Sequence, residues 1–444
     1  MDMTRYEQDI VDAVKRLVDI PSVLDEDRDE APFSDAIDRC LDETLALCAS
    51  LGMRTFKQSQ GYYGFAEIGI GEDYIGILCH LDVVPTGDLS KWNTPPFDAT
   101  VKDGVIYGRG TGDDKGPTVA AIYAVKALLD EQVKLTKRIR LIFGTDEETL
   151  WRGIAVYKQD QKPPLFAFAA DGYFPFTYAE KGLLQLDLIR LRANEDIVFH
   201  GGKNYNSVAA NAVYQGPLAT TLAGLASTAE IDVKSDDDRI EIIGVPSHAS
   251  APMIGKNAVL YLADLMRQAG VEQPHVRLLS EVFRYDYAKT ALFDEPITDH
   301  TGDITVNIGA IEMNDNILIK LDMRMPVSYA KDDIIAKVEN KVKPYGFDVV
   351  EHSFLEPLYV PLDSPFTNIL LDTYRGITGD MESQPRINGG ATYARAYPDR
   401  TVCFGVKRKG RPSFAHEPNE QIDIDVLVNG AYIYFETLKK LNDI

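Results

Sequence analysis

The apolar residues near the N-terminus recur at helical spacing. Between Ile10 and Val18 they return every three or four positions, which predicts an amphipathic helix with one buried face. The same spacing over residues 33–51 predicts a second helix, and Gly52 is a typical residue to end it. The chain is therefore expected to open with helices.

Three short apolar runs further along read as buried strands: residues 74–79 (YIGILC), 138–144 (RIRLIFG) and 165–170 (LFAFAA). A glycine-rich turn and a helical pattern at residues 118–129 separate the first two runs. Strands that alternate with helices are typical of an α/β sheet with parallel pairs. Such sheets bind ligands beyond the carboxyl ends of their strands.

The pattern changes after about residue 181, where strand-like runs such as LLQLDLIRL and ITVNIGAIEM surround one helical run, NAVLYLADLMRQ. At 444 residues the chain is longer than one hydrophobic core usually serves. Near the C-terminus the run RTVCFGV predicts a further strand, followed by a closing helix. We predict a first domain made of residues 1–181 and 387–444, with an α+β domain inserted at residues 182–386. The expected fold class is α/β, with a mixed, mostly parallel sheet flanked by helices in the first domain.

The charge of the chain narrows the choice of partners. The 68 acidic and 46 basic side chains leave a formal charge of −22. Such a charge repels nucleic acid and anionic lipid surfaces, so neither is expected as a partner. A well-solvated surface accounts for this acidity without any metal site.

The cysteines and the apolar runs indicate a cytoplasmic protein. Cys40, Cys48, Cys79 and Cys403 are widely spaced and form no CxxC pair, which favours a reducing compartment. The N-terminal stretch lacks the apolar core of a signal peptide, and no run of about eighteen apolar residues occurs. No membrane association is expected.

A histidine and an aspartate follow the first predicted strand as His80-Leu81-Asp82. On an extended chain both side chains face the same side. Asp82 could therefore accept the proton of one ring nitrogen while the other nitrogen binds a cation. A structural histidine is the alternative that this short pattern leaves open.

The glycine-rich loop of residues 108–117 carries Asp113 and Asp114 directly before a predicted helix. Carboxylates at this position could cap the helix and complement its dipole. The loop lacks the Gly-Lys-Ser/Thr order of a P-loop and is negative where phosphate would bind. Phosphate binding is therefore excluded, and a cation site remains open.

Acidic residues also follow the other two strands. Glu147 and Glu148 come after the second strand, and Asp171 follows the third. Each could lie in an exposed loop, as could His416 in the C-terminal motif SFAHEPNE. A dense acidic cluster that is not exposed requires cations to offset its repulsion.

The combination is more informative than any one motif, because His80, Asp113, Glu148 and Asp171 would emerge at the same edge of one sheet. Histidines together with carboxylates suit zinc, manganese or cobalt better than calcium. Two cations could share a carboxylate and a water molecule. Coordination would acidify that water, and a neighbouring free carboxylate could take its proton.

Seven motifs together resemble the M20 family of metallopeptidases, and the long insertion is similar to that of its dipeptidase V (PepV-like) branch. The motifs occur in family order between about residue 60 and residue 420: HLDVVPTGD, DGVIYGRGTGDDKGP, GTDEET, ADGYFP, PSHASAP, GGATYAR and AHEPNE. The resemblance implies a catalytic domain with an inserted α+β lid domain.

The resemblance also implies a ligand set for two divalent cations, of which zinc is favoured and manganese or cobalt is compatible. His80 and Asp171 would bind one ion, Glu148 and His416 the other, and Asp113 would bridge them. In this family the peptide bond at the bridging aspartate is typically cis.

Catalytic roles follow from the same resemblance. Asp82 would orient His80, Glu147 would be the general base, and His248 in the inserted domain would stabilise the oxyanion.

Substrate-binding roles are implied for four further residues. Asn206 and Arg324 would hold the substrate, and the backbone of Gly389 and Gly390 would line its site. An arginine could pair with a terminal carboxylate, although Arg324 could instead form a structural ion pair.

The predicted activity is hydrolysis of the peptide bond of small unblocked peptides by a monomeric dipeptidase. A deacylase of N-acyl amino acids in the same family is the nearest alternative. A binding protein for metal or peptide without catalysis is the alternative of another class, and an unligated Glu147 beside a full ligand set argues against it.

Overall fold

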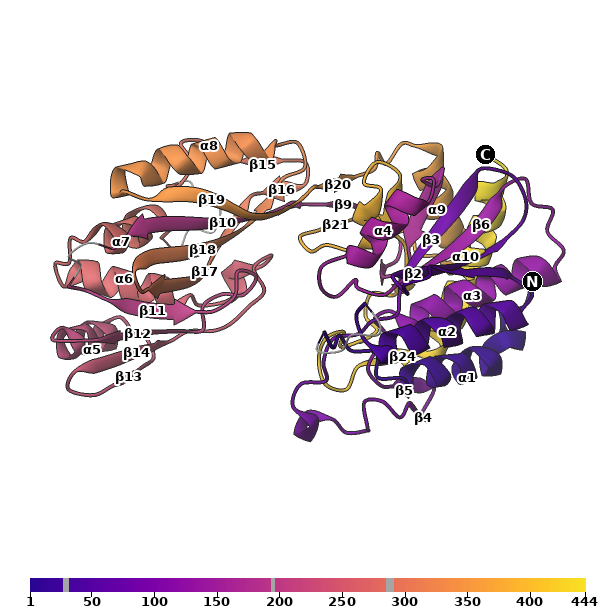
Figure 1. The fold of residues 1–444 in the computed structure, drawn as a ribbon, viewed down its shortest axis with the longest axis horizontal. Helices are drawn as coiled ribbons and strands as arrows, with labels where there is room; N and C mark the ends of the chain where they lie inside the picture. Colours follow the sequence, from indigo (N-terminus) through magenta and orange to yellow (C-terminus); the bar gives the residue numbers. More distant parts are fainter. Residues whose placement is uncertain (27–31, 193–195, 285–290) are drawn as a thin grey trace. The chain divides into compact units, whose positions relative to one another are not determined.

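A mixed sheet, with nine strands in the described part of the chain, forms the centre of one of two structural units (Figure 1). The computed structural model describes residues 1–26, 32–192, 196–284 and 291–444. Unit 1 comprises Met1–Ala179, Leu358–Ile387 and Thr392–Ile444, and unit 2 comprises Glu180–Pro357 and Asn388–Ala391. The predicted α/β domain with an α+β insertion is confirmed.

The boundary at the end of the insertion differs from the expectation. We expected the inserted domain to span residues 182–386, whereas residues 358–387 belong to unit 1. The chain returns at Leu358 because strand β20 (Leu358–Tyr359) joins the sheet of unit 1 and helix α9 (Pro365–Thr378) packs on helix α10 (Ile424–Asn442).

The sheet of unit 1 has a parallel centre and antiparallel margins. Its strand order is β1-β2-β6-β3-β7-β22-β9-β20, and β21 also pairs with β9. The register pairs β6, β3, β7 and β22 in parallel, whereas β1, β2 and β9 run antiparallel to their neighbours. Besides β20, the strands are β1 (Arg54–Lys57), β2 (Tyr63–Ile68), β3 (Tyr74–His80), β6 (Arg138–Gly144), β7 (Phe166–Ala169), β9 (Thr177–Glu180), β21 (Arg386–Asn388) and β22 (Thr401–Cys403).

Helices cover this sheet, and the central strands are buried as a result. All residues of β3 are buried, as expected for a parallel strand with both faces covered. Helix α3 is apolar almost all round and packs against β3, α1 and α10. The helices of unit 1 besides α9 and α10 are α1 (Glu7–Val18), α2 (Asp35–Ser50), α3 (Lys115–Asp130) and α4 (Arg152–Asp160), with short 3-10 helices η1 (Met3–Tyr6), η2 (Leu89–Lys91) and η6 (Tyr393–Ala396).

Two small sheets complete unit 1. One joins β4 (Thr100–Lys102), β5 (Val105–Tyr107) and β24 (Gln421–Asp423). The other is a parallel pair of β8 (Gly172–Tyr173) and β23 (Val406–Lys407), which ties the segment after β7 to the C-terminal part of the chain.

Unit 2 is an antiparallel sheet with helices on it. The strand order is β13-β14-β12-β11-β17-β18-β10-β19. Buried and half-buried residues alternate along β10, which is typical of a strand with one face on the core. The strands are β10 (Gly182–Leu191), β11 (Phe199–Gly202), β12 (Asn211–Gln215), β13 (Val233–Ser235), β14 (Arg239–Ile243), β17 (Thr305–Met313), β18 (Asn316–Met325) and β19 (Asp348–Leu355), and β15 (Thr298–Asp299) pairs with β16 (Gly302–Asp303).

The helices of unit 2 pack on its sheet. Helices α5 and α6 contact β14, and α8 contacts β19. The bounds are α5 (Ala219–Thr228), α6 (Ala258–Gln268), α7 (Pro274–Arg277) and α8 (Lys331–Val342), with η3 (Pro252–Ile254), η4 (Leu278–Val282) and η5 (Lys343–Tyr345) as shorter helical segments.

The elements predicted from periodicity are present, with one exception. The run RTVCFGV was expected to be one strand, but it divides into β22 and β23, which join different sheets. All four cysteines are buried, and none of them forms a disulfide in the described part of the chain. No helix among the described residues is long and apolar enough to cross a membrane.

A buried ion-pair network fixes the register between β2 and β6. Glu67 lies opposite Arg140, and its Oε2 accepts from Arg140 Nε at 3.0 Å, Arg140 Nη2 at 2.8 Å and Arg138 Nη1 at 3.1 Å. Although burial raises the pKa of the Glu67 carboxyl, the Arg140 guanidinium outweighs this effect and brings the pKa below its usual value.

We predict that Glu67→Gln lowers the free energy of unfolding at pH 7 by roughly 1.5–3 kcal/mol, the usual contribution of hydrogen bonds to charged groups. A carboxyl whose pKa is lower in the folded state stabilises above the unfolded pKa, and the stabilisation is lost as pH falls through the folded pKa. The difference between wild type and variant should therefore shrink below about pH 4.3. Urea unfolding measures this difference.

The control is Glu72→Gln, since Glu72 is exposed and its pair with Lys162 is also exposed. It should unfold like the wild type. A Glu67→Gln difference that stays constant down to pH 3 would contradict the role of the carboxylate charge.

Candidate metal centre

The carboxyl ends of the parallel strands place the candidate residues at one edge of the sheet. His80 is the last residue of β3 and lies beside Gly144, the last residue of β6. Glu147 and Glu148 follow β6, and Asp171 follows β7. Parallel pairing therefore brings these segments together, as the order of strands predicted.

Asp113 lies in the loop before α3, and two buried residues hold that loop. The backbone N–H groups of Gly112 and Asp113 donate to Glu420 Oε1 at 2.9 and 3.0 Å. Arg109 Nη1 donates to Glu420 Oε2 at 2.6 Å, and both side chains are almost fully buried. The peptide bond between Asp113 and Asp114 is cis.

The neighbouring carboxylate of Asp114 has a different role from the helix cap considered from the sequence. Asp114 occupies the N-cap position of α3 but makes no side-chain capping bond there. Its Oδ2 accepts instead from the backbone N–H of His80 at 3.2 Å and from the Thr118 hydroxyl at 3.3 Å. Asp114 therefore fastens the end of β3 to α3.

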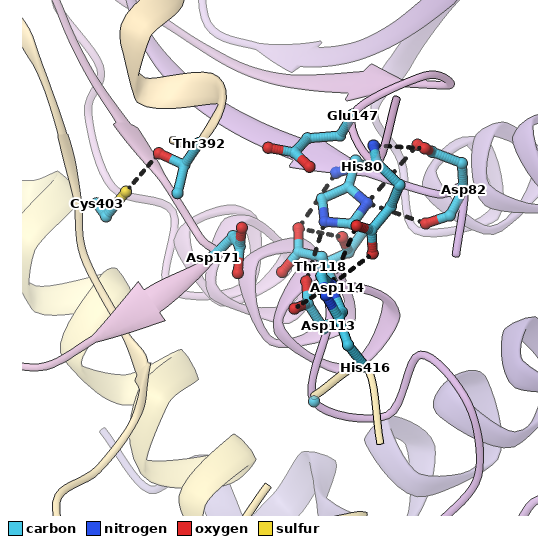
Figure 2. Close-up of polar contacts among 12 residues, drawn as sticks. His80, Asp82, Asp113, Asp114, Thr118, Glu147, Asp171, Thr392, Cys403 and His416 are labelled. Carbon is cyan, nitrogen blue, oxygen red and sulfur yellow. Dashed lines mark hydrogen bonds and ion pairs between the residues drawn. The ribbon is translucent and has the colours of Figure 1, made fainter. Parts of the chain in front are cut away.

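Asp113 lies between two imidazoles (Figure 2). Its Oδ1 is 3.1 Å from His80 Nε2, and its Oδ2 is 3.5 Å from His416 Nε2. Glu148 Oε2 lies 3.1 Å from the same His416 nitrogen. Donor atoms of His80, Asp113 and Glu148 all lie within 4.8 Å of one another, which is close enough to hold one metal ion.

Asp82 orients His80 through its backbone as well as its side chain. His80 Nδ1 lies 3.0 Å from the backbone oxygen of Asp82 and 3.7 Å from its Oδ1. Asp82 Oδ2 accepts from the backbone N–H of Glu148 at 2.9 Å. A proton on Nδ1 therefore leaves Nε2 as the coordinating nitrogen.

The electrostatics of the cluster favour a cation. Burial raises the pKa of the Asp114 and Glu147 carboxyls well above their usual values. A hydrogen bond to Glu148 raises the pKa of His416 to about 9. Buried carboxylates this close together repel one another unless positive charge lies among them.

Unsatisfied buried oxygens provide a second test of whether a metal fits. Among the described residues, Asp82 Oδ1, Asp114 Oδ1 and Glu147 Oε1 are buried without a hydrogen-bond partner. His80 presents both ring nitrogens to oxygen atoms, so one nitrogen needs a proton and the other a second proton or a cation. The residues present therefore fit a divalent cation.

Asp171 is the predicted ligand that stands apart from this group. Figure 2 shows it to one side of His80 and Asp113. Its Oδ1 accepts from Lys407 Nζ at 3.1 Å, and the same Nζ lies 3.5 Å from Asp113 Oδ2. The Lys407 residue is only 8% exposed, so this amine is part of the cluster.

His248 and Asn206 lie together in unit 2. Ser207 and His248 form a β-bridge, and the Asn206 backbone oxygen accepts from Ala249 N–H at 2.9 Å. Both the His248 and the Asn206 residues are exposed. His248 Nδ1 accepts from the Ser250 N–H at 3.2 Å, so the proton of the neutral ring is on Nε2.

Arg324 is engaged with protein groups. Its Nε and Nη2 donate to the Asp322 carboxylate at 2.6 and 3.1 Å, and its Nη1 donates to the Gly389 oxygen at 2.7 Å. Both side chains of the pair are buried. These contacts fit the structural ion pair that the sequence left open. Gly390 N–H, next in the loop, donates to Asn388 Oδ1 at 3.0 Å.

The sequence did not indicate several residues that shape the site. Lys407, Arg109 and Glu420 reach it through contacts between distant segments, and Tyr393 packs its ring 6.3 Å from that of His80. Glu420 and Tyr393 lie within the motifs AHEPNE and GGATYAR. The motifs were therefore the only available signal, and no motif contains Lys407.

The fold and this cluster define a protein of two units with a candidate metal centre of imidazoles and carboxylates. Comparison with protein families identifies the class of protein: the model of the peptidase family M20/M25/M40 matches residues 76–440. The chain belongs to this family, and it is a hydrolase that acts on peptide bonds.

Relatives span the whole chain. A candidate dipeptidase of Staphylococcus haemolyticus is 33% identical over 464 residues, which cover 98% of this chain and 97% of the relative. An M20 family metallo-carboxypeptidase from Sulfolobus solfataricus superimposes with a TM-score of 0.61 at 18% identity, over 98% of this chain and 99% of that one. A dinuclear metal-binding M20 peptidase of Bacillus subtilis gives 0.54 at 12% identity, over 99% and 98%.

We predict that Arg324→Met lowers the free energy of unfolding by about 3–5 kcal/mol, because it leaves the Asp322 carboxylate buried without its cation. Denaturant unfolding followed by circular dichroism measures the change. Lys320→Met in the same strand is the matched control. Lys320 pairs with the partly exposed Glu312, so the control should cost at most about 1 kcal/mol.

A wild-type unfolding midpoint for Arg324→Met, together with weaker substrate binding, would instead show that the guanidinium serves the substrate.

Proposed function

We propose that this protein is a metal-dependent dipeptidase, which hydrolyses the peptide bond of short unblocked peptides and acts as a monomer. The observation that carries the proposal is the cluster of His80, Asp113 and Glu148 beside a buried Glu147 oxygen without a partner. The candidate dipeptidase that is 33% identical over nearly the whole chain supports the substrate class.

Two divalent cations are proposed, in keeping with the dinuclear peptidase of the same fold. His80 and Asp171 would hold one ion, Glu148 and His416 the other, and Asp113 would reach both. The mixed nitrogen and oxygen donors favour zinc, and they are compatible with manganese or cobalt. When bound, the cations would supply Lewis acidity toward a water molecule and the scissile carbonyl group.

Glu147 is the proposed general base and acid. It would take the proton of the attacking water and pass it to the leaving amine. Its Oε1 is buried and without a protein partner, whereas Glu148 contacts His416. A carboxylate oxygen that the protein leaves unpaired can move a proton without first breaking a hydrogen bond.

His248 is the proposed donor to the oxyanion that develops on the carbonyl oxygen. Because Nδ1 accepts from the Ser250 N–H, the neutral ring carries its proton on Nε2. Asn206 would bind the substrate beside it, and the backbone of Gly389 and Gly390 would line the site. Arg324 would act by holding the Gly389 oxygen in place.

The alternative of an N-acyl amino acid deacylase uses the same metals and base. It differs in the absence of a free α-amine on the substrate. The relatives support the dipeptidase, and no observation favours the deacylase or a non-catalytic binding protein.

We predict that Glu147→Gln lowers kcat for dipeptide hydrolysis by about 10²–10⁴-fold, the usual contribution of a general base. Its metal content should be unchanged, because Glu147 is not a proposed ligand. Dipeptide assays and elemental analysis of the same preparation measure both quantities. Glu72→Gln, which removes one exposed charge, should keep wild-type activity.

Loss of bound metal in Glu147→Gln would make Glu147 a ligand instead of a base. Unchanged turnover would refute both roles.

A second prediction concerns metal removal and substrate class. Metal-stripped protein should be inactive, and zinc or manganese should restore hydrolysis of free dipeptides but not of N-acetyl amino acids. Amine release from a panel of both substrate types measures this. Restored cleavage of the acetylated compounds alone would move the assignment to a deacylase, and no activity on either would favour the binding protein.

A further inference from the structure

Lys407 places an ammonium group among the proposed metal ligands. Its Nζ lies 3.1 Å from Asp171 Oδ1 and 3.5 Å from Asp113 Oδ2. Asp171 belongs with His80 to one proposed ion subsite, and Asp113 is shared by both subsites. Within the described residues, Lys407 forms ion pairs with Asp113 and Asp171 but not with Glu148.

The backbone holds Lys407 in this position. Strand β23 pairs in parallel with β8, so that Lys407 lies beside Tyr173. Gly172 N–H donates to the Gly405 oxygen, and Phe174 N–H donates to the Lys407 oxygen, each at 2.9 Å. The segment that carries Asp171 and the segment that carries Lys407 are therefore hydrogen-bonded to each other directly beside the contact.

A metal ion at this subsite would use the Asp171 oxygen that Lys407 now contacts. Zinc binds carboxylate oxygens at about 2.0–2.2 Å. An ion at that distance from both carboxylates would lie close to an ammonium that is hydrogen-bonded to one of them. Two positive charges in a buried site repel strongly, so the amine must leave Asp171 before the ion can bind well.

Lys407 reaches the other subsite through one shared oxygen, Asp113 Oδ2. Glu148 Oε2 and His416 Nε2 lie 3.1 Å apart. His416 Nε2 also lies 3.5 Å from Asp113 Oδ2. Asp113, Glu148 and His416 are thus already in contact, whereas Asp171 is paired with Lys407. The first ion therefore meets ligands that are already together.

We propose that Lys407 is a built-in competitor for the metal subsite of Asp171, so that the two cations bind in sequence and with unequal affinity. This inference rests on the ligand assignment of the proposed function. The first ion binds at Glu148 and His416. The second ion binds only as Lys407 withdraws from Asp171, so that full assembly of the centre depends on the free metal concentration.

The test is a zinc-binding isotherm of the full chain. Metal-stripped protein is dialysed against buffers of increasing free zinc, and the ions bound per chain are measured by elemental analysis. We expect two steps in the wild type, separated by at least tenfold in free zinc. In Lys407→Met the second step should shift to at least tenfold lower free zinc, and the first step should change little.

The matched control is Lys409→Met, which removes the same charge from an exposed residue two positions away. It should give the wild-type isotherm. Lys407→Gln serves as a second uncharged variant if Lys407→Met does not fold, as judged by circular dichroism. It should shift the second step in the same direction.

Three outcomes would overturn the proposal. The first is that both ions bind to the wild type at the same free zinc concentration. The second is that the second step is unchanged in both folded Lys407 variants. The third is that the second step of these variants moves to higher free zinc. The first outcome needs no variant and therefore does not depend on folding.

Failure of the proposed function gives a different result. Fully zinc-loaded protein that does not cleave dipeptides would refute the dipeptidase assignment, whereas the isotherm would still show whether Lys407 competes. A chain that binds no zinc at all would refute the ligand set, and the inference on Lys407 with it.

Discussion

The centre of this protein is organised by the electrostatic cost of bringing carboxylates together where water is largely excluded. Asp82, Asp113, Asp114 and Glu147 surround the end of one buried strand (Figure 2), and Glu148 lies beside His80 and Asp113. Each would prefer solvent or positive charge. The parallel strands nevertheless end at the same edge of the sheet, so the fold itself imposes the cluster. Imidazoles, backbone N–H groups and a lysine offset part of this cost, and bound cations would offset more.

The groups that offset this charge also fix the geometry. Glu420, itself paired with Arg109, accepts from the two N–H groups that set the position of Asp113. Asp114 accepts from the backbone of His80, and Asp82 accepts from the backbone of Glu148. Carboxylates therefore serve as braces between segments as well as candidate ligands. One oxygen of Glu147 takes no part in this bracing, which is what a proton-transfer group requires.

The same electrostatic cost explains why a lysine, Lys407, lies among these carboxylates. A fold that gathers carboxylates without metal must supply another cation, and an ammonium held by β23 meets this need at Asp171. An internal cation stabilises the centre before metal arrives. It also opposes the ion that would replace it, because like charges cannot share the same oxygens at low cost. Lys407 would therefore stabilise the metal-free state and lower the affinity for the second ion.

Much of this could be predicted from the sequence. The apolar runs before His80, Glu147 and Asp171 identified three central strands, and the rule that parallel strands end together predicted a shared edge. Local patterns suffice for such inferences because strands and the residues that follow them are neighbours in the chain. They failed where one apolar run, RTVCFGV, divides between two sheets and where residues 358–387 return to unit 1. The decisive pairings are remote: Lys407 is 236 residues from Asp171, and Glu420 is 311 residues from Arg109. No periodicity encodes which distant charges will meet, so only the tertiary structure could show the pairing of Arg109 with Glu420 and the lysine within the metal centre.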